Sequence, residues 1–428
     1  MDNEIKDFVV VPTFKTRPWR VVSILLILVG GVSFGIGVSG PYAQRAWQVY
    51  LVNFLFWSGL SSGAILFVAV LNMTSARWGR PLKRLAEALG AFMPVAFLLF
   101  WLLYFGRNEI FPWIHEPVPG KEKWLTTGFL FARDGVGLFL LTAVGTALLY
   151  YSVKKDTRRI SSHLTSGDVP SSGINERSGS VRGIDRDRHW RRQLVLSPIL
   201  GILYALVLTL LSFDLVMSLD PHWVSTLFGG YFFVGSFYTA LASLSVLAGL
   251  SWKTAGAGKV LRFRHFHDLG KLLLGFCLMT GYLFYSQFLV IWYANIPEET
   301  RYILRRLRQN PWEPLAWVIL AVCFVLPFLT LLSRKTKMRP VPMMALSGLI
   351  LLGMWLERFL LVAPSLSHSE EIPLGLMELL ITAGFLGAMA LTVIVFLNRF
   401  GLFSLSDPLF QEEVKRILEE TKEASHGN

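Results

Sequence analysis

Residues 193–214 read QLVLSPILGILYALVLTLLSFD, a run of apolar side chains that ends in the carboxylate Asp214. A helix needs about 20 such residues to cross about 30 Å of hydrocarbon, so this stretch predicts a transmembrane helix. Nine other stretches share its character, and the ten lie near residues 21–40, 46–72, 86–106, 127–152, 193–214, 224–251, 267–294, 314–333, 341–363 and 373–397. The sequence therefore predicts an all-α integral membrane protein with ten transmembrane helices.

The basic residues of the loops predict how these helices are oriented. Of the 41 Lys and Arg residues, 30 lie in the terminal segments and in the loops that follow spans 2, 4, 6 and 8, whereas 8 lie in the other loops. Cytoplasmic loops carry an excess of Lys and Arg, so both termini are expected to be cytoplasmic. The net charge of +12 then reflects contact with anionic lipid, and no nucleic-acid partner is expected.

The chain divides into five predicted segments. They are a cytoplasmic lead at 1–20, spans 1–4 at 21–152, a flexible basic cytoplasmic loop at 153–192, spans 5–10 at 193–397, and a cytoplasmic tail at 398–428. The loop is rich in Ser, Gly, Arg and Asp and cannot bury a core of its own. In the tail, Asp407 and Pro408 predict the start of an amphipathic helix that lies on the membrane or on a partner. Pro297, followed by two acidic residues, predicts a short surface helix through Arg308.

Small residues and cysteines predict helix packing rather than cofactor binding. Gly31 with Gly35, and Gly59 with Gly63, would allow close approach of neighbouring helices. Cys277 and Cys323 lie in apolar stretches and no CxxC motif occurs, so we expect neither a metal nor an iron–sulfur cluster bound by this chain alone. No pair of histidines is placed at membrane depth, and haem is not expected either.

Ionisable residues within the spans are the strongest functional signal of the sequence. Each costs roughly 2.5–3.5 kcal/mol at a helix centre, so each should face the bundle and find a partner. All belong to the predicted outer half of the membrane, and the inner half is expected to be less charged. The residues are Arg133, Asp134, Asp214, Glu357, Arg358 and Glu378, with Asp220 and His222 just above them.

This outer cluster has two readings. Four carboxylates face two positive charges, and burial favours the neutral form of a carboxyl, so the cluster could hold and exchange protons. It could equally consist of neutral ion pairs that lock helices together. A polar path from the inner side is predicted from hydroxyl, amide and ammonium groups, although each could instead serve packing, and Lys271 could extend to the surface. These residues are Ser58, Ser61, Lys271, Thr280, Tyr282, Tyr285 and Gln287.

Four segments carry a resemblance to a known family. They are WQVYLVNFLFWSGLSSGAILF (47–67), FLFARDGVGLFLL (129–141), SFDLVMSLDPHWVSTLFGGYFFVGSFYTALA (212–242) and FLVIWYANIPEETRYILRR (288–306). The chain resembles the F subunits of bacterial alternative complex III, which are related to the NrfD/polysulfide-reductase membrane subunits. The resemblance extends over essentially the whole chain. It implies two four-helix bundles, spans 2–5 and 6–9, flanked by spans 1 and 10.

The resemblance also implies a function. The chain would be a cofactor-free subunit of a quinol:electron-acceptor oxidoreductase in the bacterial inner membrane, within a respiratory or photosynthetic chain. It would scaffold the complex and translocate protons rather than carry the redox reaction, and Arg133, Asp134, Asp214, Asp220 and His222 lie in matching segments. The implied partners are an NrfD-like C subunit, an iron–sulfur B subunit, multihaem cytochrome c subunits, small membrane subunits, membrane lipids and a terminal oxidase. The implied cofactors are menaquinol or ubiquinol in the complex, and haem c and iron–sulfur clusters on the partners.

Two alternatives stay open from the sequence. In the first, the chain itself binds and oxidises quinol, with His222 accepting a proton, Asp214 assisting and Arg133 orienting the pair. In the second, it is a secondary transporter, which ten helices with buried carboxylates allow. No matched pair of broken helices stands out in the two halves of the sequence, which argues against transport.

Overall fold

The computed structural model describes residues 16–165, 188–253, 257–367, 371–405 and 407–426. Within these ranges ten helical segments are long and apolar enough to cross a bilayer, which confirms the predicted all-helical, multi-pass architecture. The spans are α2 (Arg17–Ser39), α3 (Ala43–Met73), α4 (Arg80–Gly90) with α5 (Met93–Leu102), α7 (Thr127–Thr165), α9 (Arg188–Leu215), α10 (Phe228–Trp252), α12 (Phe263–Ala294), α14 (Trp312–Leu320) with η4 (Ala321–Val325) and α15 (Leu326–Leu332), α17 (Pro340–Leu366) and α18 (Leu376–Phe400).

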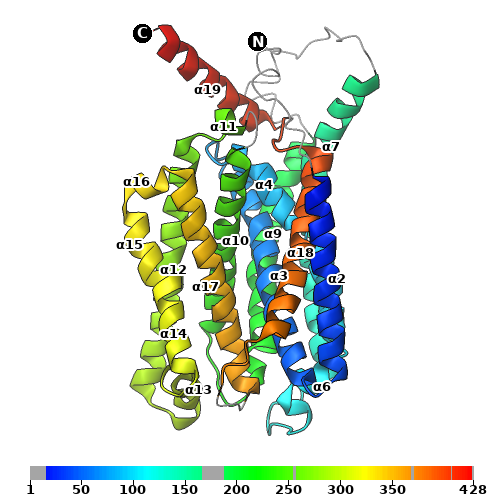
Figure 1. Cartoon of the computed structure of the whole chain (residues 1–428), viewed down its shortest axis with the longest axis vertical. Coiled ribbons are helices and arrows are strands. Elements are labelled where there is room, and N and C mark those ends of the chain that lie inside the picture. The colour runs from blue at the N-terminus through cyan, green and yellow to red at the C-terminus, as the bar shows by residue number, and fades with distance from the viewer. Residues whose placement is uncertain (1–15, 166–187, 254–256, 368–370, 406, 427–428) are drawn as a thin grey trace.

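Shorter helices lie at the two ends of this bundle (Figure 1). They are α6 (Arg107–Ile110), η1 (Pro112–Ile114), η3 (Met217–Leu219), α11 (Ala257–Val260), α13 (Pro297–Leu307), α16 (Arg334–Lys337) and α19 (Pro408–His426). Helices α13 and α19 are the two helices that the sequence predicts outside the spans. Helix α7 continues through Thr165, so the predicted basic loop begins with helix, and the parts of the lead and loop at 1–15 and 166–187 lie outside the described residues.

Prolines interrupt the third and eighth spans. Pro94 sits in the first turn of α5, and Pro327 in the first turn of α15. Proline has no N–H, so Pro327 cannot bond the carbonyl four residues earlier, that of Cys323. That carbonyl lies in the π-helical segment η4 and accepts hydrogen bonds from Tyr238 Oη (3.2 Å) and Cys277 Sγ (3.6 Å). Two neighbouring spans, α10 and α12, thus satisfy the group that the proline frees.

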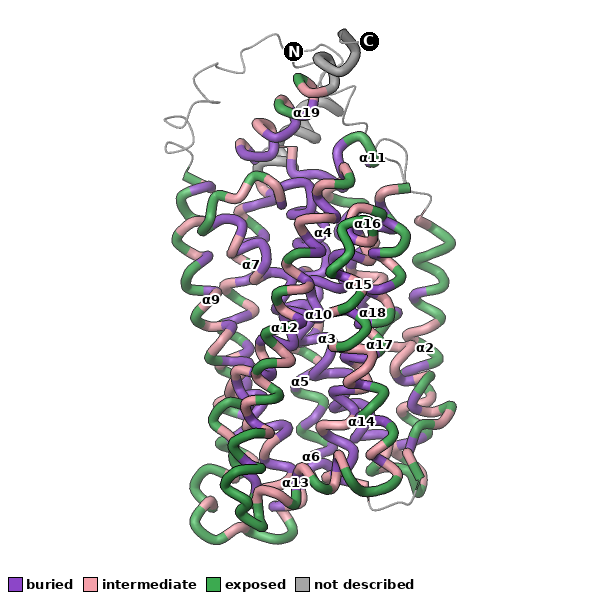
Figure 2. Tube along the Cα trace, turned by 90° about the vertical axis from the view of Figure 1, so that its left-hand side faces the viewer, coloured by how far each residue is buried: buried purple, intermediate pink, exposed green. Residues whose placement is uncertain are grey.

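Helices α3 and α10 form the centre of the bundle. In α3 and α10, 89% and 78% of the most apolar stretch of the helix is buried, whereas the share is 17% in α2 and in α12. Figure 2 shows the buried residues gathered along the middle helices. The two helices pack directly on each other. A Cβ atom added at Gly59 would lie 2.6 Å from Ser236 Oγ, and one at Gly63 would lie 2.8 Å from the Ala240 Cβ. The predicted role of Gly59 and Gly63 in close packing is confirmed.

The first span packs through a different glycine from those predicted. Gly31 and Gly35 have nothing within 4 Å of an added Cβ, so the prediction for this pair is wrong. A Cβ at Gly30 would instead lie 2.5 Å from the Gly384 Cα, where α2 crosses α18. The apolar pattern of α2 does not reveal which glycine faces its partner, because the exposed side of this helix is apolar as well.

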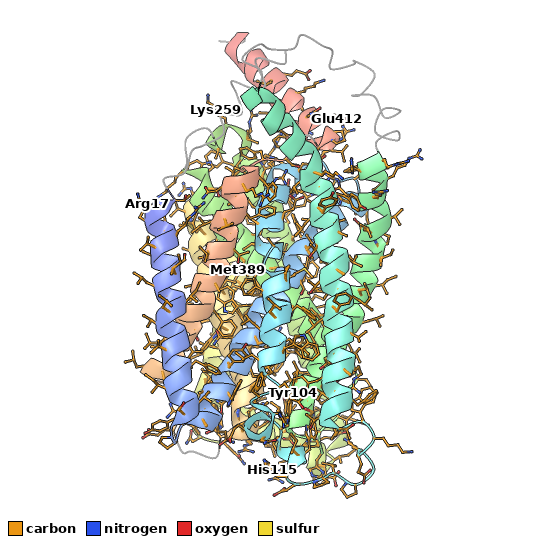
Figure 3. The ribbon with its side chains drawn as sticks, turned by 90° about the vertical axis from the view of Figure 1, so that its right-hand side faces the viewer. Arg17, Tyr104, His115, Lys259, Met389 and Glu412 are labelled. Atoms are coloured by element: carbon orange, nitrogen blue, oxygen red, sulfur yellow. The ribbon has the colours of Figure 1, made fainter. Side chains whose placement is uncertain are left out.

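Figure 3 places Arg17, Lys259 and Glu412 at one end of the molecule and Tyr104 and His115 at the other. We call these the basic end and the opposite end. At the basic end, α19 lies against the chain itself. Its apolar stripe of Leu409, Phe410, Val414 and Ile417 is buried, so the chain's own helices, rather than lipid or a partner, cover this face.

We predict that Gly30→Leu destabilises the packing of α2 against α18, because the added side chain has no space beside Gly384. Overpacking of this kind costs about 1–3 kcal/mol. The neighbouring Gly31→Leu is the matched control, since it adds the same side chain to open space. Thermal unfolding of the purified chain in detergent measures both. Equal midpoints for the two variants would contradict the close contact.

Candidate functional site

An arginine and an aspartate from neighbouring spans form the core of the site near the opposite end. Arg133 of α7 donates hydrogen bonds to Asp214 Oδ2 of α9 from Nε (2.8 Å) and from Nη2. Trp124 Nε1 donates to the other oxygen, Oδ1, at 3.0 Å. The guanidinium carbon of Arg133 also lies 3.7 Å from the centre of the Trp124 ring. The expectation that Arg133 faces the bundle and finds a partner is confirmed, and the partner lies on another helix.

Asp134 adds a second carboxyl to this pair. Its side chain is 1% exposed, and among the described residues no donor reaches either of its oxygens. Its carboxyl lies within interaction range of Asp214 and Arg133. Two buried carboxyls that interact with each other cannot both carry a full charge at low cost, so one proton between them would stabilise such a pair. With one proton, the set of Arg133, Asp134 and Asp214 is electrically neutral.

Glu357 and Arg358 form a second buried cluster between α10 and α17. Tyr231 Oη donates to Glu357 Oε1 at 2.6 Å, and Arg358 Nη1 lies 3.3 Å from Glu357 Oε2. Arg358 Nη2 also donates to Ser236 Oγ at 3.2 Å. Each of the two residues therefore finds partners on α10, as predicted, although they also pair with each other.

Glu378 has a structural environment of its own. It accepts a hydrogen bond from Arg45 Nη2 at 2.8 Å and caps the start of α18 by accepting one from the Gly375 backbone N–H, also at 2.8 Å. Arg45 belongs to α3, so this pair joins the second and tenth spans. The structure thus separates Glu378 from the carboxyl pair near Asp214.

The other predicted residues divide between interior and surface. His222 is exposed at the opposite end, and Asp220 is half-buried. Ser58 and Ser61 are buried and donate to backbone carbonyls of their own helix. Thr280 is half-buried and donates to the Phe276 carbonyl of α12, and Gln287 is buried on the same helix.

Three members of the predicted inner path do not lie inside the protein. Tyr282 and Tyr285 are 67% and 58% exposed on the outer face of α12. Lys271 extends to the surface, where its Nζ lies 2.7 Å from Asp268 Oδ1. These three residues are therefore removed from the predicted path. The sequence could not exclude them, because polar residues that follow one another along a helix point to different sides of it, including the side that faces outward.

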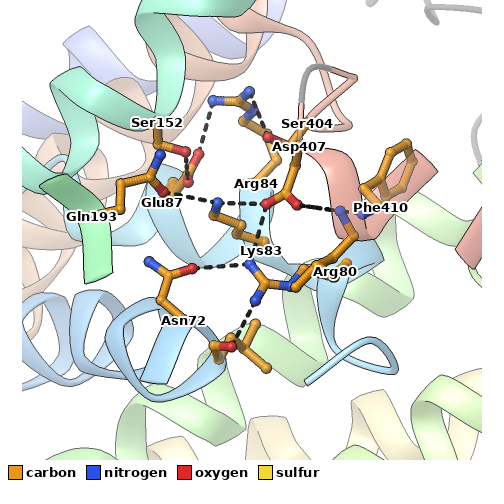
Figure 4. Close-up of polar contacts among 12 residues, drawn as sticks. Asn72, Arg80, Lys83, Arg84, Glu87, Ser152, Gln193, Ser404, Asp407 and Phe410 are labelled. Atoms are coloured by element: carbon orange, nitrogen blue, oxygen red, sulfur yellow. Dashed lines mark hydrogen bonds and ion pairs between the residues drawn. The ribbon is translucent and has the colours of Figure 1, made fainter. Parts of the chain in front are cut away.

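A third cluster, at the basic end, was not predicted (Figure 4). Arg80, Lys83 and Arg84 lie on one face of α4 and are at most 1% exposed. Lys83 Nζ lies 2.7 Å and Arg80 Nη1 3.1 Å from Asp407 Oδ2, and Arg84 Nη1 lies 2.8 Å from Glu87 Oε2. The expectation of a less charged inner half is therefore wrong.

Side chains from four segments complete this basic-end cluster. Gln193 Oε1 accepts from Lys83, Asn72 Oδ1 accepts from Arg80, Ser404 Oγ accepts from Arg84, and Ser152 Oγ donates to Glu87. The predicted third span, 86–106, begins after these residues, whereas the helix begins at Arg80, so its first turn was expected in a loop. A usable signal was present, because Arg80, Lys83 and Arg84 recur at helical spacing around Leu82 and Leu85.

Asp407 has two roles in this cluster. Its Oδ1 accepts from the Leu409 backbone N–H at 3.0 Å, which confirms the predicted cap of α19. Burial by itself would raise the pKa of Asp407, but the charges of Lys83 and Arg80 and the Phe410 N–H hold that pKa well below its usual range. The carboxylate is therefore ionised at neutral pH, and the pair attaches the carboxyl-terminal segment to α4.

Comparison with known proteins gives the class of this fold. Residues 37–368, which include α3 through α17, match the protein family that is described as "Polysulphide reductase, NrfD". The chain therefore belongs to the NrfD family, whose members are membrane subunits of quinone-interacting oxidoreductase complexes. A search of curated proteins found no match to the chain. Helices α18 and α19, and α2 except for its last turn, lie outside the matched region.

We predict that Asp407→Asn lowers the free energy of unfolding by about 3–5 kcal/mol, because it leaves Arg80 and Lys83 buried with one anion fewer. The exposed Glu419 supplies the control variant Glu419→Gln. Thermal unfolding and the rate of proteolysis of the carboxyl-terminal tail measure the loss of stability. Equal unfolding temperatures and equal proteolysis rates in the two variants would contradict the prediction.

The pH dependence of the attachment of α19 follows from the direction in which the pKa of Asp407 is shifted. The folded pKa of Asp407 is depressed, so its stabilisation is fully present above about pH 4, the ordinary range of an unfolded aspartate. It is lost only as the pH falls through the lowered folded pKa. Release of α19 should therefore not begin between pH 5 and pH 8, which limited proteolysis across that range tests. Release centred near neutral pH would contradict a paired Asp407.

Proposed function

We propose that this chain is a membrane subunit of a quinol-oxidising complex of the alternative complex III type, and that it scaffolds the complex and translocates protons. Membership of the NrfD family supports the quinone-linked setting. The observation that carries the proton role is the pair of buried carboxyls, Asp134 and Asp214, beside Arg133, which bonds to Asp214 and leaves Asp134 without a hydrogen-bond donor among the described residues.

The proposed orientation places the basic end in the cytoplasm. The loops and terminal segments of that end carry most of the lysines and arginines, which membrane proteins retain on the cytoplasmic side. Asp134 and Asp214 then lie near the outer surface of a bacterial inner membrane. Protons would enter the chain from the basic end and leave beside this carboxyl pair.

Buried polar groups between the two ends support a path of this kind. Ser58, Ser61 and Ser62 of α3 are at most 3% exposed. Ser243 and Ser245 of α10 and Ser347 of α17 are buried, and their hydroxyls have no hydrogen-bond partner among the described residues. A buried hydroxyl without a protein partner is a site that an ordered water can satisfy. Waters at these hydroxyls would link the α3–α10 interface into a chain.

The step at the carboxyl pair needs no cofactor on this chain. When Asp134 is protonated, Asp214 carries the charge that Arg133 balances. A proton that reaches Asp214 displaces the proton of Asp134 toward the outer surface, and the pair returns to one proton and one negative charge. Arg133 holds Asp214 in place through its hydrogen bonds, and its positive charge balances the one negative charge of the carboxyl pair.

Electron transfer would occur on partner subunits in this proposal. They are a second NrfD-like subunit, an iron–sulfur subunit and multihaem cytochromes c, with menaquinol or ubiquinol as the electron donor. Direct oxidation of quinol by His222 and Asp214 is less well supported, because both oxygens of Asp214 already accept hydrogen bonds from Arg133 and Trp124.

We predict that Asp134→Asn and Asp214→Asn uncouple proton movement from electron transfer. Loss of a positioned proton carrier slows a proton-transfer step by about a hundredfold or more. The proton-to-electron ratio of the reconstituted complex should therefore fall, while quinol oxidation at zero membrane potential persists. Glu109→Gln, an exposed carboxyl at the same end, is the control. An unchanged ratio in both aspartate variants would remove the proton role.

We also predict that the tagged chain, purified gently from native membranes, retains an iron–sulfur protein and c-type haem proteins. Mass spectrometry and haem absorbance identify these partners. Gly30→Leu, which disturbs only the α2–α18 contact at the edge of the bundle, tests whether the flanking spans hold partners. Isolation of a lone chain that moves a solute across vesicles would replace the scaffold role by transport.

A further inference from the structure

Among the ten spans of the described residues, the more apolar spans are the less buried ones. The four most apolar spans, which are α2, α9, α18 and the span of α14, η4 and α15, have mean hydropathies of 2.4–2.7, and 17–33% of their most apolar stretches is buried. Five of the six less apolar spans have mean hydropathies of 1.6–2.0, and the buried share is 39–89%. Lipid solvates apolar side chains well, so spans that carry more polar groups occupy the interior.

Helix α12 is the sixth of the less apolar spans, and it departs from this trend. Its mean hydropathy is 1.6, the same as that of α10, yet 17% of its most apolar stretch is buried, against 78% in α10. The same buried share occurs in α2, whose mean hydropathy is 2.5. Helix α12 therefore combines the composition of an interior helix with the exposure of an edge helix, so one side of it lacks the protein cover that its composition requires.

The outward side of α12 carries a seam of exposed residues at alternating spacings of three and four. The residues of this seam are Gly275, Leu278, Tyr282, Tyr285, Leu289 and Trp292. A Cβ atom added at Gly275 would have nothing within 4 Å, so the seam has a hollow there and large rings further along. The other side of α12 lines a cavity, together with α10, α13, α14 and α17. Alternating spacings of three and four are typical of the line along which neighbouring helices pack.

Tyr282 brings a polar group to the middle of this span. It lies between Lys271, which extends to the surface, and Trp292, so that about 15 Å of helix separates it from either end of the apolar stretch. Its side chain is 67% exposed, and no described residue forms a hydrogen bond with its hydroxyl. The side chain is too short to reach either membrane surface, and acyl chains offer neither donor nor acceptor. The hydroxyl therefore needs a polar partner from outside the chain.

We infer that the seam of α12 is the docking surface for a transmembrane helix of another polypeptide, which places a polar side chain opposite Tyr282. The partner helix would present a large side chain to the hollow at Gly275 and small side chains to the rings of Tyr282 and Tyr285. The inference rests on the proposed function only in requiring a complex with a second membrane-spanning polypeptide. It is independent of the proton role.

A second copy of the chain fits the seam less well than a helix of different sequence. Two copies related by a twofold axis along the membrane normal would set α12 parallel to itself, with Tyr282 against Tyr282 and Gly275 against Gly275. Large rings would then meet large rings while the hollow stayed empty, and close packing disfavours both. A covering of lipid alone would leave the Tyr282 hydroxyl without a partner.

Site-directed photocrosslinking of the full chain in its native membranes tests the inference. The photoreactive amino acid p-benzoylphenylalanine replaces Leu289 on the seam or, as the control, Leu28, which is 58% exposed on α2. We expect the probe at Leu289 to give an excess of adduct with one polypeptide. Mass spectrometry should place that crosslink in a membrane-spanning segment with a polar residue near its middle. Adducts with lipid only, with a differently tagged second copy, or in equal yield at both positions would overturn the inference.

Two pairs of variants separate docking from folding. Tyr282→Phe removes the hydroxyl in the middle of the span, and Tyr42→Phe removes a 56% exposed hydroxyl at the turn between α2 and α3. Gly275→Leu fills the hollow, and Gly31→Leu adds the same side chain to open space on α2. The adduct yield at Leu289 should fall about three- to tenfold in Tyr282→Phe, and at least as much in Gly275→Leu, with unfolding temperatures equal to those of the controls. Adduct yields equal to those of the controls would refute the docking surface.

The same preparations distinguish failure of the docking surface from failure of the proposed function. If iron–sulfur and c-type haem proteins are retained but the probe on the seam captures only lipid, the docking surface is wrong and the complex stands. If the probe captures a transmembrane helix in a preparation without those proteins, the docking surface stands and the proposed complex is wrong.

Discussion

Charge that is buried in a membrane protein must be balanced inside the protein, and this constraint decides which helices of the chain meet. Arg80 and Lys83 are balanced by Asp407, more than 320 positions away in the sequence, and Arg133 is balanced by Asp214 on the next span. Apolar contacts alone would not select these partners, because lipid tails solvate an apolar helix face as well as another helix does. An unpaired ion in the same place would be far more costly, so the ion pairs specify the arrangement that close packing then stabilises.

The close packing itself is concentrated at α3 and α10. Gly59 and Gly63 let the two backbones approach at Ser236 and Ala240, and Ser236 also accepts a hydrogen bond from Arg358. Arg358 lies beside Glu357, whose other partner is Tyr231 on the wall of the cavity. The central interface is therefore continuous with the second buried cluster, and through it with the cavity between α12 and α14.

The molecule thus separates two kinds of chemistry. The first half holds a carboxyl pair that shares one arginine, an arrangement suited to holding one mobile proton. The second half holds a cavity with many aromatic side chains, which α10, α12, α13, α14 and α17 line. At the basic end, Asp407 and the buried stripe of α19 close the bundle, and ion pairs from Arg77 to Glu412 and from Arg264 to Glu413 extend this contact across both halves.

The sequence by itself determined the ten spans, because each needs only a long apolar run, and it located the ionisable residues of the fourth, fifth, ninth and tenth spans. It also predicted α13 and α19 from proline and acidic residues at their starts. Only the tertiary structure decided partners and faces. Gly30 rather than Gly31 meets α18, Tyr282 and Tyr285 point away from the interior, and Arg80, Lys83 and Arg84 are buried although they resemble loop residues. The physical reason is that hydropathy measures the cost of leaving water, whereas burial of a charge depends on an opposite charge that the fold brings from a distant segment.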